Sequence, residues 1–206
     1  MTKILDSDPE HLLQLAKAGD SPTLGRLLEF YRAYLVLLAR VQIGRRLQGK
    51  VDASDIVQEA FLGAHRDFPQ FRGKTEPEFL AWLRQILASL LANLVRHYQG
   101  TQRRDVRLER QLAIELQQSS QALGRSLVAP QSSPSQQAIR REQSAVLADA
   151  LGRLPQEWRE VLILRHLEGL SFPDVARRLN RTIDSVKKQW PRALASLRQL
   201  LEGQTP

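Results

Sequence analysis

The chain has 206 residues, enough for one or two small domains, and carries a formal net charge of +8 at pH 7. This excess suits an anionic partner but is far from the charge of a histone-like polycation. The absence of cysteine excludes disulfides and thiolate metal sites. The acidic stretch 1–10 does not resemble a signal peptide, and the best apolar run, Ile86–Val95, is too short to span a membrane. We therefore expect a cytoplasmic protein without membrane insertion.

The N-terminal half is predicted to be helical, because its periodic segments have helical spacing and no strand pattern interrupts them. Helices are expected over about 9–18, 21–44, 52–68 and 75–98. The second carries one continuous apolar stripe, and the fourth opens with a capping-box pattern formed by Thr75 and Glu78. Four such helices can bury one core.

A polar segment separates this half from the next. Residues 117–137 are rich in Ser, Gln and Pro, and such a composition predicts a mobile tether. The preceding stretch, 103–116, can extend helically into it. The expected fold class is therefore all-α, with two small helical domains joined by a flexible linker. The expected domains are a four-helix unit over 1–100, a linker over 101–137 and a second helical unit over 138–206.

The second unit is predicted to contain a helix-turn-helix over Leu170–Lys188, after a helix that opens at Leu154-Pro155. Ser171 and Asp174 form a cap, and Ala176 is small enough for a second helix to cross closely. Asn180 follows the first helix, where a left-handed residue is needed. A short helix, a tight turn and a basic second helix suit the DNA major groove.

The second helix of this motif is expected to begin after a cap at Thr182. Arg181 occupies a turn position that is more often apolar, and we expect Ile183 to fill that space. Pro191 is expected to bend the helix. The side chains left to face outward are Asp184, Ser185, Lys187, Lys188 and Arg192. A helical hairpin whose lysines only keep it soluble is the alternative reading of this segment.

The helix predicted over 52–68 has an unusual polar face. Asp52, Asp55, Gln58, Glu59 and Leu62 recur at helical spacing, opposite an apolar face. An acidic stripe in a basic protein is consistent with a protein partner, but from this helix alone an ordinary solvated face is the favoured explanation. A catalytic carboxylate pair lacks any accompanying histidine or nucleophile. The four histidines lack metal spacing, so neither a metal site, a cofactor nor an enzyme activity is expected.

Several motifs together resemble those of bacterial sigma-70 family RNA polymerase sigma factors. The resemblance to region 2 lies in Asp52–Phe61, Phe71-Arg72-Gly73 and Phe79–Ile86, and Gly19-Asp20 resembles the start of that region. The resemblance to region 4 lies in Leu154–Arg165, Glu168–Ser171 and Val186-Lys187. The two patterns in this order, with no further domain between them, are typical of the extracytoplasmic-function (ECF) subgroup. Ser89 stands where the family usually has an asparagine.

The resemblance implies a transcription initiation factor that binds core RNA polymerase and promoter DNA. The surface that docks on polymerase is implied to contain Asp52, Asp55, Gln58, Glu59 and Leu62. The part that captures the melted −10 strand is implied to contain Phe71, Arg72, Lys74, Arg84, Arg96, His97, Tyr98, Arg103 and Arg104. The −35 duplex is implied to meet Asp184, Ser185, Lys187, Lys188 and Arg192. An anti-sigma regulator, common in the family, is a further candidate partner.

Two other functions fit parts of the sequence. The first is a stand-alone helix-turn-helix regulator whose N-terminal half serves dimerisation or sensing. The second is a helical nuclease or hydrolase that uses Asp52 and Asp55. Polymerase binding by the N-terminal half would distinguish a sigma factor from the first alternative, and a metal-dependent activity screen would reveal the second.

Overall fold

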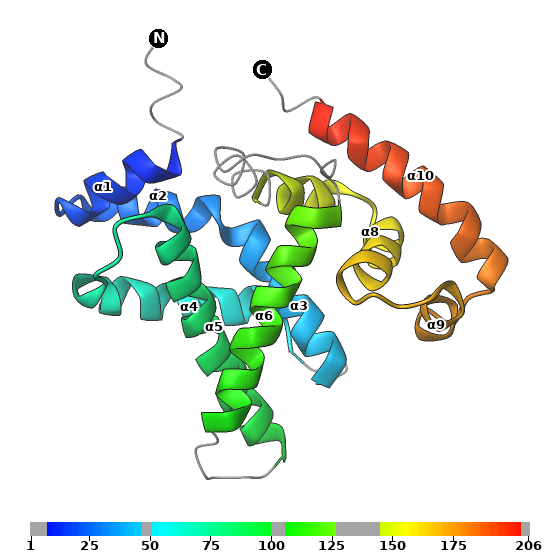
Figure 1. The fold of residues 1–206 in the computed structure, drawn as a ribbon, viewed down its shortest axis with the longest axis horizontal. Helices are drawn as coiled ribbons and strands as arrows, with labels where there is room; N and C mark the ends of the chain where they lie inside the picture. Colours follow the sequence, from blue (N-terminus) through cyan, green and yellow to red (C-terminus); the bar gives the residue numbers. More distant parts are fainter. Residues whose placement is uncertain (1–7, 47–50, 100–105, 127–144, 203–206) are drawn as a thin grey trace. The chain divides into compact units, whose positions relative to one another are not determined.

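The computed structural model describes residues 8–46, 51–99, 106–126 and 145–202, and Figure 1 shows their arrangement. The described residues are helical and contain no strand, as the sequence predicts. The chain divides into two compact units, residues 1–117 and 118–206. Arg103 and Arg104, two candidate DNA-binding residues, lie outside the described part of the chain, as do residues 127–144, which include the second half of the polar segment 117–137.

The first unit opens with a helical hairpin. Helix α1 spans Pro9–Lys17 and helix α2 spans Ser21–Phe30. Asp20 caps α2 by accepting hydrogen bonds from the backbone N–H and the hydroxyl of Thr23. Gly19 joins the two helices with a φ of 104°, a conformation that glycine adopts without steric cost. These boundaries agree with the sequence-based prediction for the first helix and for the start of the second.

The predicted second helix is divided in the structure, because α2 ends at Phe30 and α3 begins at Arg32, running to Arg46. Tyr31, the residue between them, is fully buried, and its hydroxyl donates a hydrogen bond to the buried carboxylate of Glu76. The apolar stripe continues through both helices. Sequence periodicity therefore located the buried face correctly and missed the break.

Helices α4 (Ala53–Asp67) and α5 (Glu76–Gln99) complete the core of the first unit, and the short helix η1 (Phe68–Gln70) follows α4. Their apolar faces pack against each other and against α3. By length and composition alone, α5 could cross a membrane over Glu76–Tyr98, but half of that window is buried within the protein. Its packing against α3 and α4 makes it the central core helix of the unit.

Helix α6 (Val106–Ser126) extends further than the sequence indicated. A helix was expected only as far as residue 116, followed by a polar tether. The prediction of a mobile tether was wrong for residues 117–126, which continue the helix. Leu112 and Leu116 are fully buried, and Ser119 is nearly so. The division between the two compact units falls within this helix.

The second unit begins, in its described part after α6, with a helix over residues 145–153. Helix α8 (Gln156–Leu162) continues into a π-helical turn, η2 (Ile163–Leu167). Gly169, with a φ of 70°, then ends this segment. The helix-turn-helix follows as α9 (Phe172–Arg178) and α10 (Ile183–Glu202). Helix α10 is continuous across Pro191.

The turn of this motif has the predicted geometry. Ser171 accepts a hydrogen bond from the backbone N–H of Asp174, and Asn180 has a φ of 52°. Thr182 caps α10 by accepting from the backbone N–H of Ser185. The hydroxyl of Ser171 donates to Asp174 and is the main cause that lowers the pKa of that carboxyl group. The left-handed residue and both caps thus lie where the sequence placed them.

The helix-turn-helix packs around a small apolar cluster of Val161, Leu164, Val175, Ala176 and Val186, bordered by Leu170, Phe172, Leu179 and Trp190. The expectation that Ile183 fills the space beside Arg181 was wrong, because Ile183 is 41% exposed and lies outside this cluster. Arg181 instead bonds Gln189 of α10 and forms an ion pair with Glu157 of α8. A polar contact thus replaces the usual apolar one.

Candidate functional surfaces

The acidic face of α4 is exposed. Asp52, Asp55, Gln58 and Glu59 all lie at the surface, and Leu62 is 64% exposed beside them. The opposite face of α4 is buried through Ile56, Val57, Ala60 and Phe61. An exposed leucine that continues an acidic stripe has no packing role in the unit. The exposed face of α4 therefore combines acidic and amide side chains with one apolar side chain.

Two members of this face also have local structural roles. The Asp52 side chain caps α4 by accepting from the backbone N–H of Ser54 at 2.8 Å. Gln58 accepts a hydrogen bond from Arg32 of α3 at 3.0 Å, and the Arg32 guanidinium lies over the ring of Phe61, 4.9 Å from its centroid. Asp55 and Glu59 have no such structural role within the described residues. They are therefore the better positions at which to test this face by substitution.

The loop after η1 is held in a defined shape by residues on both sides. One carboxylate oxygen of Glu78 accepts from the backbone N–H groups of Lys74 and Thr75, at 2.7 and 3.0 Å, and also from the Thr75 hydroxyl. These bonds, led by the one from Lys74, lower the pKa of Glu78. The ammonium group of Lys17 donates to the carbonyl of Gly73 at 2.6 Å. One half of the capping box predicted for Thr75 and Glu78 is thus present, in which the Glu78 carboxylate accepts from the Thr75 backbone N–H.

Phe71 does not present its ring to a base, contrary to the sequence-based prediction. It is only 9% exposed and packs with Phe68, Phe79 and Trp82, with ring centroids 5.0–5.9 Å apart. Phe79 is fully buried. Phe71 therefore supports the loop from beneath, while Arg72 and Lys74 remain exposed above it.

The position of Arg84 also differs from the sequence-based prediction of a DNA contact. Its side chain is 9% exposed, and its guanidinium donates to the buried hydroxyl of Tyr34 at 2.9 Å. An arginine in this position stabilises the packing of α5 on α3 and is not available to a DNA phosphate. The sequence offered no sign of this partner, because Tyr34 lies on another helix fifty residues away.

The basic end of α5 keeps its predicted exposure. His97 and Tyr98 lie at the surface, with Tyr98 47% exposed, and their rings meet edge to face. Arg96 is half-buried and hydrogen-bonds Asn93 one turn earlier. With Arg72 and Lys74 before the start of α5, these residues give the first unit exposed cations and the two accessible rings of His97 and Tyr98.

The outward face of α10 carries the residues predicted for duplex contact. Asp184, Lys187, Lys188 and Arg192 are exposed, and Ser185 is half-buried. Val186, Ala193 and Leu197 occupy the buried face of the same helix. A helix presented in this way, with its first turns uncovered, is the form in which a recognition helix enters the major groove.

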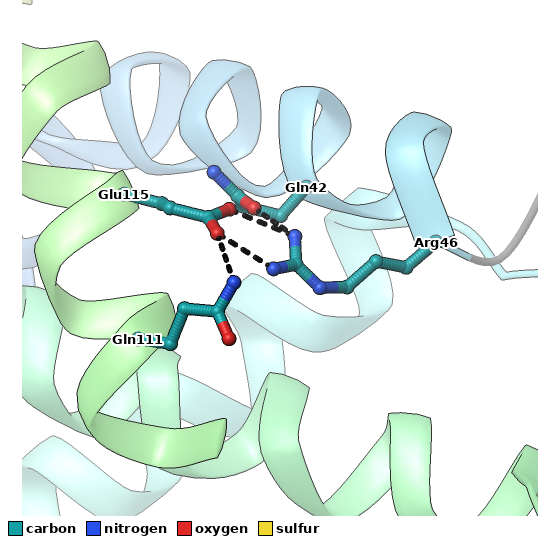
Figure 2. A network of polar contacts seen from close by, with 4 residues as sticks. All are labelled: Gln42, Arg46, Gln111 and Glu115. Atoms are coloured by element: carbon teal, nitrogen blue, oxygen red, sulfur yellow. Dashed lines mark hydrogen bonds and ion pairs between the residues drawn. The ribbon is translucent and has the colours of Figure 1, made fainter. Parts of the chain in front are cut away.

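A polar network that the sequence did not indicate joins α3 to α6 (Figure 2). Arg46 donates two hydrogen bonds to the carboxylate of Glu115, at 2.8 and 2.9 Å, and a third to Gln42. Gln111 supports the same carboxylate at 2.9 Å. Nearby on α5, Gln85 and Ser89 both donate to Glu109 of α6. Two carboxylates of α6 are therefore held by residues of the first unit.

Within the described residues, no group of three or more histidine, aspartate or glutamate side chains is arranged to hold a metal ion. The fold leaves an acidic exposed face on α4 and exposed basic side chains near the ends of α5 and on α10.

Comparison with known proteins agrees with this arrangement. The pattern described as Sigma-70 region 2 matches residues 30–101, and the one described as Sigma-70, region 4 matches residues 144–197. The ECF RNA polymerase sigma factor BldN of Streptomyces coelicolor is 29% identical over 95% of this chain and 68% of its own length. The ECF RNA polymerase sigma-E factor of Haemophilus influenzae is 27% identical over 93% of this chain and 92% of its own.

A third relative is longer than this chain. The probable RNA polymerase sigma factor RfaY of Xanthomonas campestris is 29% identical over 96% of the chain, which spans 45% of the relative's length. The region 2 match lies in the first compact unit of the structure, and the region 4 match lies in the second. The chain thus belongs to the sigma-70 family, in its ECF group, and is a transcription initiation factor that directs RNA polymerase to promoters.

Proposed function

We propose that the exposed face of α4 docks on core RNA polymerase, that the first unit holds the melted −10 strand, and that α10 reads the −35 duplex. The division of labour follows the domains expected from the sequence, with 1–100 as region 2, 101–137 as the connection and 138–206 as region 4. The protein works in the cytoplasm, where polymerase and promoters are found. It contributes recognition, and polymerase carries out the chemistry.

One observation carries the proposal: surfaces of opposite character occur on different helices of one chain. The docking face of α4 is acidic and ends in an exposed leucine. The face of α10 carries Lys187, Lys188 and Arg192 without covering side chains. An acidic face is disfavoured on DNA and is suited to a basic protein surface, whereas the cations of α10 suit phosphates and guanine.

The −10 surface consists of Arg72, Lys74, Arg96, His97 and Tyr98, now without Phe71 and Arg84. Unpaired bases are held by positive charge along the backbone and by accessible rings on which they stack. His97 and Tyr98 are exposed rings of this set, and Glu78 holds the backbone of the loop that carries Arg72 and Lys74. Arg103 and Arg104 remain part of the proposal as residues that follow this end of α5 in the sequence.

The deciding experiment is run-off transcription by core polymerase with the full chain on a library of promoters. A defined set of promoters should be transcribed only when the chain is present. Permanganate reactivity on a selected promoter then shows whether the −10 region is opened. Transcription that does not depend on the chain would leave a stand-alone helix-turn-helix regulator as the function. An anti-sigma protein remains a candidate partner, to be sought by co-purification with the full chain.

A further inference from the structure

Helix α6 covers polar side chains that belong to the first unit. We define the polar strip as Arg46 of α3 with Gln85 and Ser89 of α5. Every member of the strip donates a hydrogen bond to a carboxylate of α6: Arg46 to Glu115, and the other two to Glu109. Figure 2 shows the Arg46 part of this contact, in which both carboxylate oxygens of Glu115 are engaged. The side chains of Arg46 and Glu115 are each 19% exposed.

The two members of the strip on α5, Gln85 and Ser89, share a face of that helix with Arg96, a residue of the proposed −10 surface. With 3.6 residues per turn, Ser89 is rotated by about 40° and Arg96 by about 20° from Gln85 around the helix axis. The three residues therefore form one line along α5. Because Glu109 is bonded to two of them, α6 lies over the line that leads to Arg96.

The contacts that hold α6 are of the kind that hold a nucleic-acid backbone. A bidentate arginine–carboxylate pair has the geometry of an arginine–phosphate pair. Hydroxyl and amide side chains are common donors to DNA phosphates. Glu109 and Glu115 are separated by six residues, which is about 9 Å along a helix. Helix α6 thus offers two anionic groups in sequence to the donors of the strip.

The charges of α6 are also sorted between its two faces. Its acidic residues Glu109 and Glu115 are partly buried against the first unit, whereas Arg107 and Arg110 are exposed. A helix that merely filled an apolar surface would not need carboxylates on its buried side. Leu112 and Leu116 fill the apolar middle of the inner face of α6, and the two carboxylates flank them, opposite the donors of the strip, in a protein of net charge +8.

From these contacts we propose that α6 is an internal competitor of the melted promoter strand. In the free protein, Glu109 and Glu115 occupy the polar strip. When α6 leaves, Arg46, Gln85 and Ser89 become additional contacts for strand phosphates, continuous with Arg96. The proposal deepens the −10 function proposed above and rests on it. It assigns DNA contacts to three residues outside the candidate set and a restraining role to the helix at the start of the connection.

The test compares the full chain with its Glu109→Gln, Glu115→Gln double variant. Docking of α6 is measured by hydrogen exchange, and binding is measured with fluorescein-labelled single-stranded DNA of mixed sequence, about 20 nucleotides long. Mixed sequence suffices because phosphate contacts do not depend on the bases. The variant should lose protection in α6 and bind the strand more tightly, by a factor between about 5 and about 150, the range typical of coupled sites.

A matched control removes the same charge elsewhere. Glu10 and Asp149 are exposed and lie outside α6 and the strip, so the Glu10→Gln, Asp149→Asn variant has the same net charge as the test variant. Its strand affinity should rise much less than that of the test variant. An equal rise in both would mean that bulk charge alone acts and would overturn the proposal. So would unchanged affinity after α6 loses protection, or an α6 that keeps its protection in the test variant.

A separate measurement keeps the proposed function distinct from this inference. The same proteins are assembled with core polymerase, and permanganate reactivity of the −10 region is recorded. In one outcome, the wild-type complex opens the promoter while the free variant binds the strand no more tightly than the wild type does. That pair of results would overturn the competitor role of α6 and leave the proposed function intact. Failure of the wild-type complex to open any promoter would remove both.

Discussion

The indole N–H of Trp190 donates a hydrogen bond to Nε2 of His166 at 3.1 Å, and the two rings stack with an interplanar angle of 17°. The contact joins the recognition helix α10 to the π-helical turn η2. Phe172 of α9 meets the other side of Trp190 edge to face, and the Arg165 guanidinium lies over the Phe172 ring. The orientation of α10 thus depends partly on a histidine that must be neutral, because a protonated Nε2 cannot accept a hydrogen bond.

The stability of the second unit should therefore fall in mild acid. Burial lowers the pKa of His166, and the charge of Arg165 lowers it further. As the pH falls, His166 binds a proton at a higher pH in the unfolded chain than in the folded one. The stability that neutral His166 contributes is therefore complete above about pH 6.5, the ordinary pKa of histidine, and is lost as the pH falls through the lower pKa of the folded state. Urea unfolding between pH 7.5 and pH 5 checks this, followed by tryptophan fluorescence.

The control for this prediction is His166→Gln, in which an amide oxygen can accept from Trp190 but does not titrate. The variant should show a weaker pH dependence than the wild-type chain over the same interval, since the other three histidines are common to both. Identical pH profiles for the two proteins would show that His166 does not govern this dependence.

Polymerase docking should be abolished by Asp55→Lys combined with Glu59→Lys. Both side chains are exposed and neither packs in the core, so helicity should be unchanged. Like charges placed opposite each other at an interface cost several kcal/mol, which corresponds to at least about a hundredfold loss of affinity. Binding of labelled core polymerase measures this effect. Reversal at Glu10 on α1, also exposed, is the control and should leave the affinity close to that of the wild type.

Duplex recognition should separate into two kinds of contact on α10. If Arg192 reaches a guanine, Arg192→Ala should relax sequence preference at one position by about 1–3 kcal/mol. Lys188→Ala should weaken binding to all sequences alike and reduce the slope of log affinity against log salt by about 1. Titrations of both variants at several salt concentrations, on promoter and unrelated duplexes, distinguish the two. Normal binding by both would mean that another face of the second unit meets DNA.

How far the sequence predicted the structure depended on whether the signal was local. The caps at Ser171 and Thr182 and the left-handed Asn180 are set by neighbours in the chain, and all three were predicted correctly. The break at Tyr31 falls on a residue whose hydroxyl bonds Glu76 of a distant helix, a contact that local periodicity does not reveal. The same limitation hid the Tyr34 partner of Arg84.

Composition misled the prediction for α6 in a different way. Glutamine and serine made residues 117–126 look like a tether, although a helix needs only one apolar stripe and glutamine is a fair helix former. Leu112 and Leu116 supply that stripe just before the polar stretch. At the sites, exposed residues of α4 and α10 were predicted well because their opposite faces are plainly apolar. The position of Phe71 was not predicted correctly, since an aromatic residue beside a loop can either stack on a DNA base or pack beneath the loop.

The role of Phe71 as a support gives a stability prediction at Gly73. A Cβ at this position would lie 2.7 Å from Cε2 of Phe71 and 2.9 Å from Cβ of Glu78, closer than real contacts allow. Gly73→Ala should therefore destabilise the first unit by about 1–3 kcal/mol through overpacking. Gly25→Ala is the matched control, because nothing lies within 4 Å of its added Cβ and it is in α2. That variant should be more stable by about 0.5–1 kcal/mol, and thermal unfolding measures both.

Strand opening should depend on the exposed cations of the same loop. Arg72→Gln with Lys74→Gln leaves Glu78 bonded to the backbone N–H groups of Lys74 and Thr75, so the loop should keep its conformation while losing two charges. Opening a promoter costs a few kcal/mol for each base that leaves the stack, and charge contacts to the released strand offset part of that cost. Permanganate footprints on duplex promoter should therefore weaken more than closed-complex binding does. A template with a preformed −10 bubble removes the melting cost. It should therefore rescue a variant that is defective in opening the strands, but not one that is defective in holding the released strand. Equal footprints from wild type and variant on duplex DNA would exclude this loop from strand capture.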